Sequence, residues 1–318
     1  MKKINTYFRK NKSIIFIFVV ILSIIFFSFY QYFKDYYSYS KSYYEIKEKC
    51  YKKDIKGNKY CSFFSDESQL NNYIENNNPK EKFDKLDAIT LTCEIVENNL
   101  FSILQLLSPM LIIIAIIGTV HAEFNSGMFK NYLMRMNYKQ YLKKKIFQLM
   151  KIAFILPCSL IIIFVCSCLI TKFNFNVDPT VKNIVVYDSW KYKNFIFYGF
   201  MICLLQYIMS IVYGCIGLFY SVKNKNPIIT SIIAYITFIF EDLIIYIIIY
   251  SIIINKVFGL KELTEYFNIT GYWFFNQPMN YAILILIAFL IFLCNFIFIC
   301  YKLSNKEKVV IENEKQNA

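Results

Sequence analysis

The chain has 318 residues, of which 57% are hydrophobic, 19% aromatic and 18% charged, and its formal net charge is +13. Soluble globular proteins are about 45–50% apolar and about 25% charged, so both departures indicate a protein solvated by lipid. The apolar residues come in long uninterrupted blocks, which excludes a disordered chain, a collagen-like chain and an ordinary cytosolic enzyme. We therefore expect an all-α integral membrane protein.

Six segments are long enough to cross a bilayer, because about 20 apolar residues in a helix span roughly 30 Å of hydrocarbon. The first begins like a signal peptide, but its apolar run of 21 residues exceeds the usual h-region of about 7–15, so we expect a retained anchor. The last starts after Pro278, because the uncharged run before it is too long for one helix. The expected transmembrane helices are 13–33, 98–120, 149–171, 194–222, 226–255 and 280–301.

Charge predicts which side of the membrane each connecting segment faces. Residues 1–12 hold five basic and no acidic side chains, and residues 121–151 hold seven basic and one acidic. Lys and Arg accumulate in cytoplasmic loops, so both termini should be cytoplasmic in the cell membrane, and the basic charge does not indicate nucleic-acid binding. The expected segments are a basic arm at 1–12, a small extracytoplasmic insert at 34–97, a cytoplasmic segment at 121–148, an extracytoplasmic loop at 172–193, an extracytoplasmic segment at 256–279 and a cytoplasmic tail at 302–318.

Three of the ten cysteines lie outside the expected transmembrane helices, all in the insert. Disulfides persist outside the cytoplasm, and Cys50 and Cys61 are close enough in sequence for a short-loop bridge. Cys93 would then be the odd one. The other seven cysteines are expected to be small apolar fillers within helices.

The sequence contains no familiar catalytic motif. It has one histidine, His121, so no histidine-cluster metal site can form within one chain. It has neither a GxSxG nucleophile elbow nor a GxxxxGK[ST] phosphate loop. We expect no catalytic residue, no metal site and no cofactor bound by this chain, so that any ATP and Mg²⁺ would be held by a separate polypeptide.

The cytoplasmic segment after the second transmembrane helix carries the strongest pattern. Its apolar residues recur at the spacing of one helix face, which predicts a helix lying along the membrane surface. Lys130 and Arg135 fall outside that face, which leaves a basic remainder. A positive-inside loop that happens to be helical would give the same pattern. The apolar positions are Met128, Phe129, Tyr132, Leu133 and Met136.

This segment resembles the corresponding one of type-2 ABC transporter permeases, which has the form E-x-x-x-G-T-x-x-x-L-L-x-x-P-x-S-R followed by a basic residue. Met128 stands where Thr is common in that family, and Met136 where Pro is common. The six expected helices, the insert after the first and the basic loop after the second are also similar. The matching residues are Glu123, Gly127, Leu133, Lys139 and the cluster Lys143–Lys145.

The resemblance implies a permease subunit, not an enzyme, of an ABC exporter that moves a peptide, an antibiotic or a similar amphipathic cargo by alternating access. Its partners would be a separate ABC ATP-binding subunit, which holds ATP and Mg²⁺, and a second permease, identical or similar. The residues in contact with the ATP-binding subunit would be Glu123, Gly127, Lys130 and Arg135. Residues 256–279 would form a re-entrant extracytoplasmic element. The alternative is a membrane sensor or scaffold without transport, which uses residues 34–97 to bind a ligand or partner.

Glu241 and Asp242 are two adjacent carboxylates within the fifth expected helix. A charge at a helix centre costs about 2.5–3.5 kcal/mol on insertion scales. The functional interpretation is that they face a path for cationic cargo or gate it. The structural interpretation is that they are hydrogen-bonded to amide side chains of other helices, and the candidates are Gln105, Gln206 and Asn295.

Overall fold

The structure is a computed structural model of the full chain, and it describes residues 12–51, 61, 64, 67–135, 137–176, 194–221, 226–244, 256 and 281–303. The described residues form helices joined by turns, and no strand occurs among them. Most of the expected segments 1–12, 172–193, 256–279 and 302–318 lie outside the described residues, as do residues 245–255 of the fifth expected helix.

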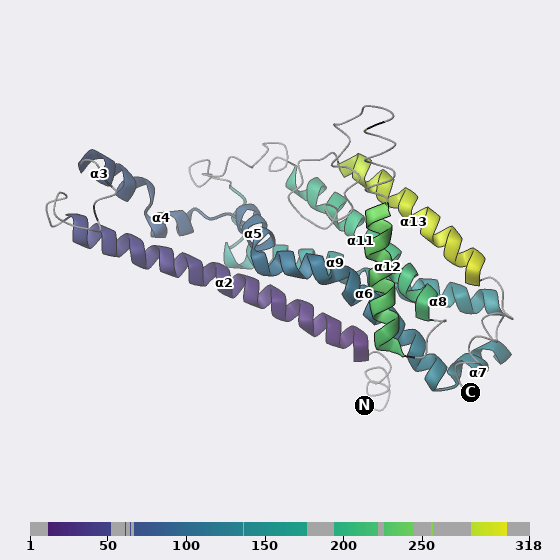
Figure 1. Ribbon diagram of the computed structural model, residues 1–318. Coiled ribbons are helices and arrows are strands. Elements are labelled where there is room, and N and C mark those ends of the chain that lie inside the picture. Colours follow the sequence, from purple (N-terminus) through teal and green to yellow (C-terminus); the bar gives the residue numbers. More distant parts are fainter. Residues whose placement is uncertain are drawn as a thin grey trace. The chain divides into compact units, whose positions relative to one another are not determined.

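The helices follow one another along the chain as Figure 1 shows. Their bounds are α2 (Lys12–Tyr51), α3 (Glu67–Asn76), α4 (Pro79–Asp84), α5 (Ala88–Glu97), α6 (Asn99–Asn125), α7 (Met128–Arg135), α8 (Tyr138–Ala153), α9 (Ile155–Ile170), α11 (Phe195–Ser221), α12 (Pro227–Ile244) and α13 (Tyr281–Leu303).

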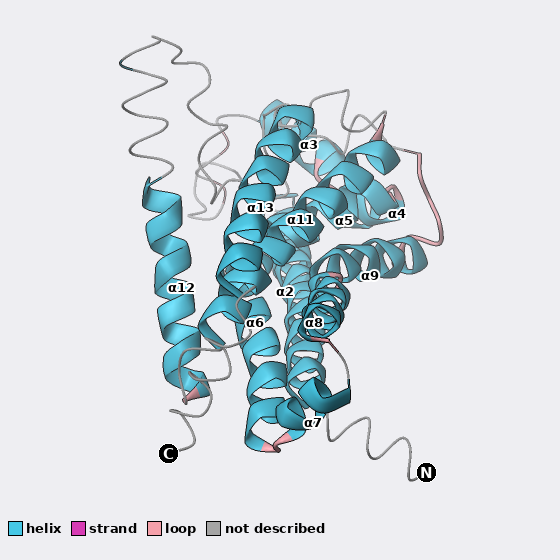
Figure 2. Cartoon of the chain, turned by 90° about the vertical axis from the view of Figure 1, so that its right-hand side faces the viewer, coloured by secondary structure: helices cyan, strands magenta, loops and turns pink. Residues whose placement is uncertain are grey.

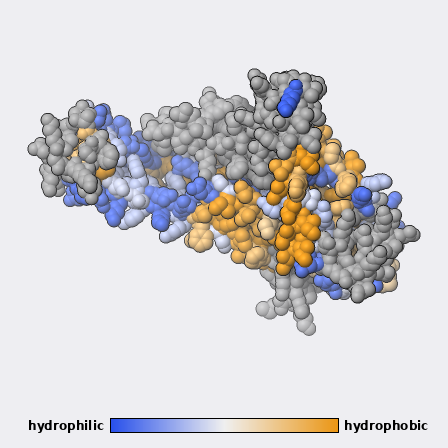
Figure 3. Space-filling model, viewed as in Figure 1, coloured by the Kyte–Doolittle hydropathy of each residue, from blue (hydrophilic) through white to orange (hydrophobic). Residues whose placement is uncertain are grey.

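Among the described residues, four helical segments are long and apolar enough to cross a membrane: Ile14–Cys50, Asn99–Asn125, Tyr138–Ile170 and Phe195–Ser221. Shorter apolar helices follow in α12 and α13, and Figure 3 shows hydrophobic residues gathered along α12. The expected all-helical, multi-pass membrane protein is thus confirmed. Six membrane crossings remain a prediction, because α12 is described only as far as Ile244.

Helix α2 does not end where its apolar stretch ends. It continues for 40 residues, about 60 Å at 1.5 Å per residue, which is roughly twice the thickness of the hydrocarbon core. Figure 3 shows the later part of α2 as mostly hydrophilic. The expected insert therefore begins as a direct helical continuation of the first transmembrane segment and not as a loop.

Prolines shape two of the long helices. Pro109 lies inside α6 and cannot donate to the carbonyl of Gln105. The hydroxyl of Ser108 donates to that carbonyl instead, at 2.7 Å. Pro157 likewise has no N–H to donate to the carbonyl of Ala153, and α8 ends at Ala153. The continuous apolar stretch therefore becomes two helices, α8 and α9.

The chain divides into two compact units. The first unit comprises Met1–Ile24, Ser102–Ile161 and Ile196–Ala318, and the second comprises Ile25–Phe101 and Ile162–Phe195.

In the second unit, α3 and α4 pack along α2. Three tyrosines spaced at i, i+3 and i+7 on α2 donate their hydroxyls to backbone carbonyls. Tyr36 donates to Pro79 at 2.8 Å, Tyr39 to Asn77 at 2.9 Å and Tyr43 to Ile74 at 2.8 Å. Aromatic hydroxyls thus satisfy carbonyls where α3 ends and α4 begins, which fixes both helices against α2.

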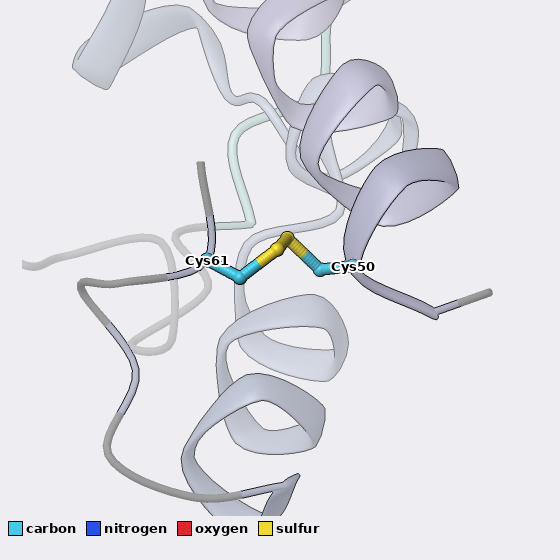
Figure 4. The surroundings of a disulfide bond; sticks show 2 residues. All are labelled: Cys50 and Cys61. Carbon is cyan, nitrogen blue, oxygen red and sulfur yellow. A yellow bond between two sulfur atoms is a disulfide. The ribbon is translucent and has the colours of Figure 1, made fainter. Parts of the chain in front are cut away.

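A disulfide joins Cys50, near the end of α2, to Cys61 (Figure 4). Both cysteines are buried in a small core with Tyr43, Leu70 and Ile74. The cross-link closes an 11-residue separation and limits the conformations of the unfolded chain. The structure thus joins the two cysteines that the sequence suggested.

In the first unit, α11 lies close to α6 and α8 because two of its positions are glycine. A Cβ atom at Gly214 would overlap the side chain of Leu149 on α8, and one at Gly217 would lie 2.6 Å from Ile116 Cγ2 on α6. Small residues let membrane helices approach each other closely. The two glycines therefore set how closely α11 packs against α6 and α8.

Candidate functional site

The segment with the permease-like pattern forms a junction between α6, α7 and α8, here called the α6–α8 junction and defined as residues 121–148. Gly127 makes the turn between α6 and α7 with a φ of +68°, a left-handed conformation that strains any residue with a Cβ atom. A Cβ atom there would meet no atom of the chain within 4 Å. Backbone conformation, and not close packing within the chain, is therefore the reason for a glycine at this position.

Aromatic rings fix α7 against its neighbours. Phe129 is buried, and its ring centroid lies 4.7 Å from that of Phe124 on α6 and 5.3 Å from that of Tyr141 on α8. The ring of Tyr132 is tilted against that of the same Tyr141, with centroids 6.1 Å apart, and the ammonium of Lys144 lies 4.1 Å from the Tyr132 centroid. Figure 2 shows α7 at the end of α6 and next to α8. These contacts join the short helix firmly to two long ones.

A buried ion pair lies beneath this aromatic cluster. The ammonium of Lys145 on α8 is 2.6 Å from the carboxylate of Glu123 on α6, and the two side chains are only 2% and 14% exposed. Tyr141 donates its hydroxyl to the same carboxylate at 3.4 Å, and Lys145 donates to the Gln148 side chain at 3.2 Å. A charge is stable at such a buried position only when it is paired and hydrogen-bonded.

The opposite side of the junction is exposed and basic. Lys130 and Arg135 on α7 are exposed, as are Lys139 and Lys143 on the first two turns of α8. Met134 is the most exposed apolar side chain of α7, at 77%. The junction thus presents cations and one methionine outward while its acidic residue points inward.

The structure separates the four expected contact residues into two groups. Lys130 and Arg135 are on the exposed surface, whereas the carboxylate of Glu123 is engaged with Lys145 and Gly127 makes the turn. Sequence reasoning did not identify Lys145 as the partner of Glu123, because it treated this residue only as one of three consecutive lysines. The helical spacing of Lys145 from its neighbours could have shown that it is buried. The buried face of α8 consists of Tyr138, Tyr141, Lys145, Leu149 and Ile152.

No family model matches the chain, and neither the curated proteins nor the solved structures contain a match.

The second candidate position, Glu241, lies on α12 and faces α13. The amide of Asn295 donates to the Glu241 carboxylate at 2.6 Å and to the carbonyl of Ile291 at 3.2 Å. Of the three amides considered from the sequence, Asn295 is thus a partner. Gln105 and Gln206 are both buried in the first unit. The side chain of Asp242 lies outside the described residues.

Glu241 and Asn295 line a cavity of about 420 Å³ bounded by α11, α12 and α13. Most of the other lining residues are aromatic or aliphatic, and they include Phe219, Tyr220, Phe240 and Phe298. Within the part of the chain that the structure describes, no group of three or more His, Cys, Asp or Glu residues is placed to hold a metal ion. The cavity therefore combines one carboxylate, that of Glu241, with a mainly aromatic and aliphatic lining.

Proposed function

We propose that this chain is the permease subunit of an ATP-driven ABC exporter, and that the α6–α8 junction docks on a separate ATP-binding subunit. In this proposal α12 and α13 are the fifth and sixth membrane crossings, both termini are cytoplasmic and a second permease completes the complex. The cargo is a peptide, an antibiotic or a similar amphipathic molecule, moved by alternating access.

The observation that carries the proposal is the attachment of α7. A coupling element must transmit movement of an ATPase to membrane helices, so it must be firmly joined to them and exposed to the partner. Helix α7 has ring contacts to α6 and α8 through Phe129 and Tyr132, while Lys130 and Arg135 remain exposed. Exposed cations suit a docking groove lined by carboxylates, where rim charges set the association rate and specificity.

The test is charge reversal at Arg135, followed by purification of the chain from its native host to measure whether an ABC ATP-binding subunit is recovered with it. Arg135→Glu should reduce the amount of that subunit recovered with the permease several-fold, together with its ATP hydrolysis. Its thermal unfolding should match that of the wild type, because Arg135 is exposed at the end of α7. Glu123→Lys is a poorer probe, since it also breaks the buried pair with Lys145.

Lys47→Glu provides the matched control, because Lys47 is an exposed cation on the distal part of α2. It should leave recovery and ATP hydrolysis unchanged. Equal recovery and hydrolysis for Arg135→Glu and the wild type would contradict the docking assignment.

A sensor or scaffold is the second candidate function, and α2 is the observation that favours it. This helix continues without a break from its apolar stretch into the disulfide-linked core of the second unit, so a ligand bound there could act directly on a membrane helix. A chain that recovers no ATP-binding subunit from any expression context would favour this candidate over the exporter.

A further inference from the structure

The cavity between α11, α12 and α13 has the features of a site for an organic cation. Its wall combines the carboxylate of Glu241 with the rings of Phe219, Tyr220, Phe240 and Phe298. Aromatic faces attract cations electrostatically, and more strongly where water is excluded. A carboxylate in the same wall supplies the counter-charge, and a volume of about 420 Å³ is within the range of small-molecule sites.

Glu241 lies far from the start of α12, at a position where a carboxylate is costly in a membrane helix. It follows Pro227, the first residue of α12, by 14 positions, which is about 21 Å along a helix axis. Ionisable residues at such depth within a membrane are costly, and they commonly mark a substrate or ion pathway. The hydrogen bond from Asn295 holds the carboxylate in place against α13.

One wall of this cavity already contacts a cation in the structure. The ammonium of Lys302 lies 5.9 Å from the ring centroid of Phe298. Lys302 follows Asn295 by seven positions on α13, which is about 10 Å along the axis. Phe298, which lines the cavity, thus has a ring that already attracts a cation of the same chain.

We propose that this cavity binds the cationic group of an amphipathic molecule, with Glu241 as its counter-ion and the aromatic rings as its apolar wall. As a cargo site the cavity rests on the proposed function, and it would restrict the exported molecules to those with a positive charge on an apolar body. As a binding site it requires neither ATP nor the ATP-binding subunit.

The experiment measures equilibrium binding of tetraphenylphosphonium to the purified full chain in dodecyl maltoside, without any ATPase. Glu241→Gln keeps the size of the side chain and an acceptor for Asn295, and it should raise the Kd at least about tenfold, since tenfold corresponds to about 1.4 kcal/mol. Triphenylphosphine oxide, a neutral probe, should bind the wild type and the variant equally. Equal Kd values of the cation for both chains would overturn the proposal.

Two further variants separate binding from folding. Glu75→Gln makes the same change at an exposed position on α3 and should leave the Kd unchanged. Phe240→Leu retains the carboxylate and removes one ring, and it should raise the Kd several-fold even if Glu241→Gln does not fold. Unchanged cation binding in Phe240→Leu would contradict the cavity as the site.

A lipid amine is the competing occupant, and a third arm detects it. Phosphatidylethanolamine added to the micelles should leave cation binding unchanged. If this lipid displaces the cation from the wild type, the cavity is a headgroup site and the proposal is wrong. Because none of these arms contains an ATPase, their failure leaves the recovery test at Arg135 unaffected, and the failure of that test leaves the binding result intact.

Discussion

Glu123 and Glu241 are both carboxylates on apolar helices of the first unit, but they differ in their surroundings. Glu123 contacts the ammonium of Lys145 and the hydroxyl of Tyr141 in a nearly closed environment. Glu241 accepts from the neutral amide of Asn295 and lines an open cavity. The Glu123 carboxylate joins two helices through an ion pair, whereas the Glu241 carboxylate also lines a cavity, where we propose that it contacts a cation from outside.

The largest expected effect comes from breaking the Glu123–Lys145 pair. Glu123→Gln leaves the Lys145 ammonium, whose side chain is 2% exposed, without its counter-charge. Removing one member of a buried ion pair typically costs about 3–5 kcal/mol. We expect a clear fall in the temperature of thermal unfolding in detergent.

A double variant checks the cause of that loss. Glu123→Gln combined with Lys145→Met removes both charges and should recover most of the stability, because similar apolar groups often replace buried ion pairs at little cost. If the double variant is as unstable as Glu123→Gln alone, an uncompensated charge is not the reason for the loss.

Substitutions at Glu241 are expected to cost less stability than those at Glu123 and to change cation binding. Glu241→Leu leaves the Asn295 amide without this acceptor and should cost about 1–3 kcal/mol, measured as folded yield and unfolding temperature. Glu241→Asn removes the charge but keeps a polar group, so folding should hold while cation binding falls. An equal loss of stability in both variants would indicate a purely structural carboxylate.

The neighbouring Asp242 sharpens the same comparison. Adjacent helix positions diverge by about 100°, so the two carboxylates cannot both face the cavity equally well. Asp242→Asn should therefore leave tetraphenylphosphonium binding within about twofold of wild type. A loss as large as that in Glu241→Asn would place both residues at the site.

The sequence allowed the helical membrane class and the presence of a helix at α7 to be predicted, because long apolar blocks and a 3.6-residue period are local signals. It did not show that Glu123 pairs with Lys145, since the two residues are 22 positions apart and meet only when α8 packs beside α6. The continuous α2 was missed for another reason. Its polar half follows the apolar half without a helix-breaking residue, so hydropathy marked a boundary that the backbone does not have.

The smallest loss of stability is expected at Gly127, which tests whether the junction depends on its turn. Gly127→Ala puts a Cβ atom at a φ of +68°, which costs about 1 kcal/mol, although there is open space around it. Gly199→Ala provides the control, since Gly199 lies inside α11 with no atom within 4 Å of a Cβ and Ala favours a helix interior. Thermal unfolding should therefore fall slightly for the first variant and hold or rise for the second. The same two variants sharpen the comparison of the carboxylates, because a strained turn should loosen α7 and reduce recovery of the ATP-binding subunit without changing tetraphenylphosphonium binding at Glu241. If Gly127→Ala lowered cation binding as much as subunit recovery, the junction and the cavity would not be separate sites.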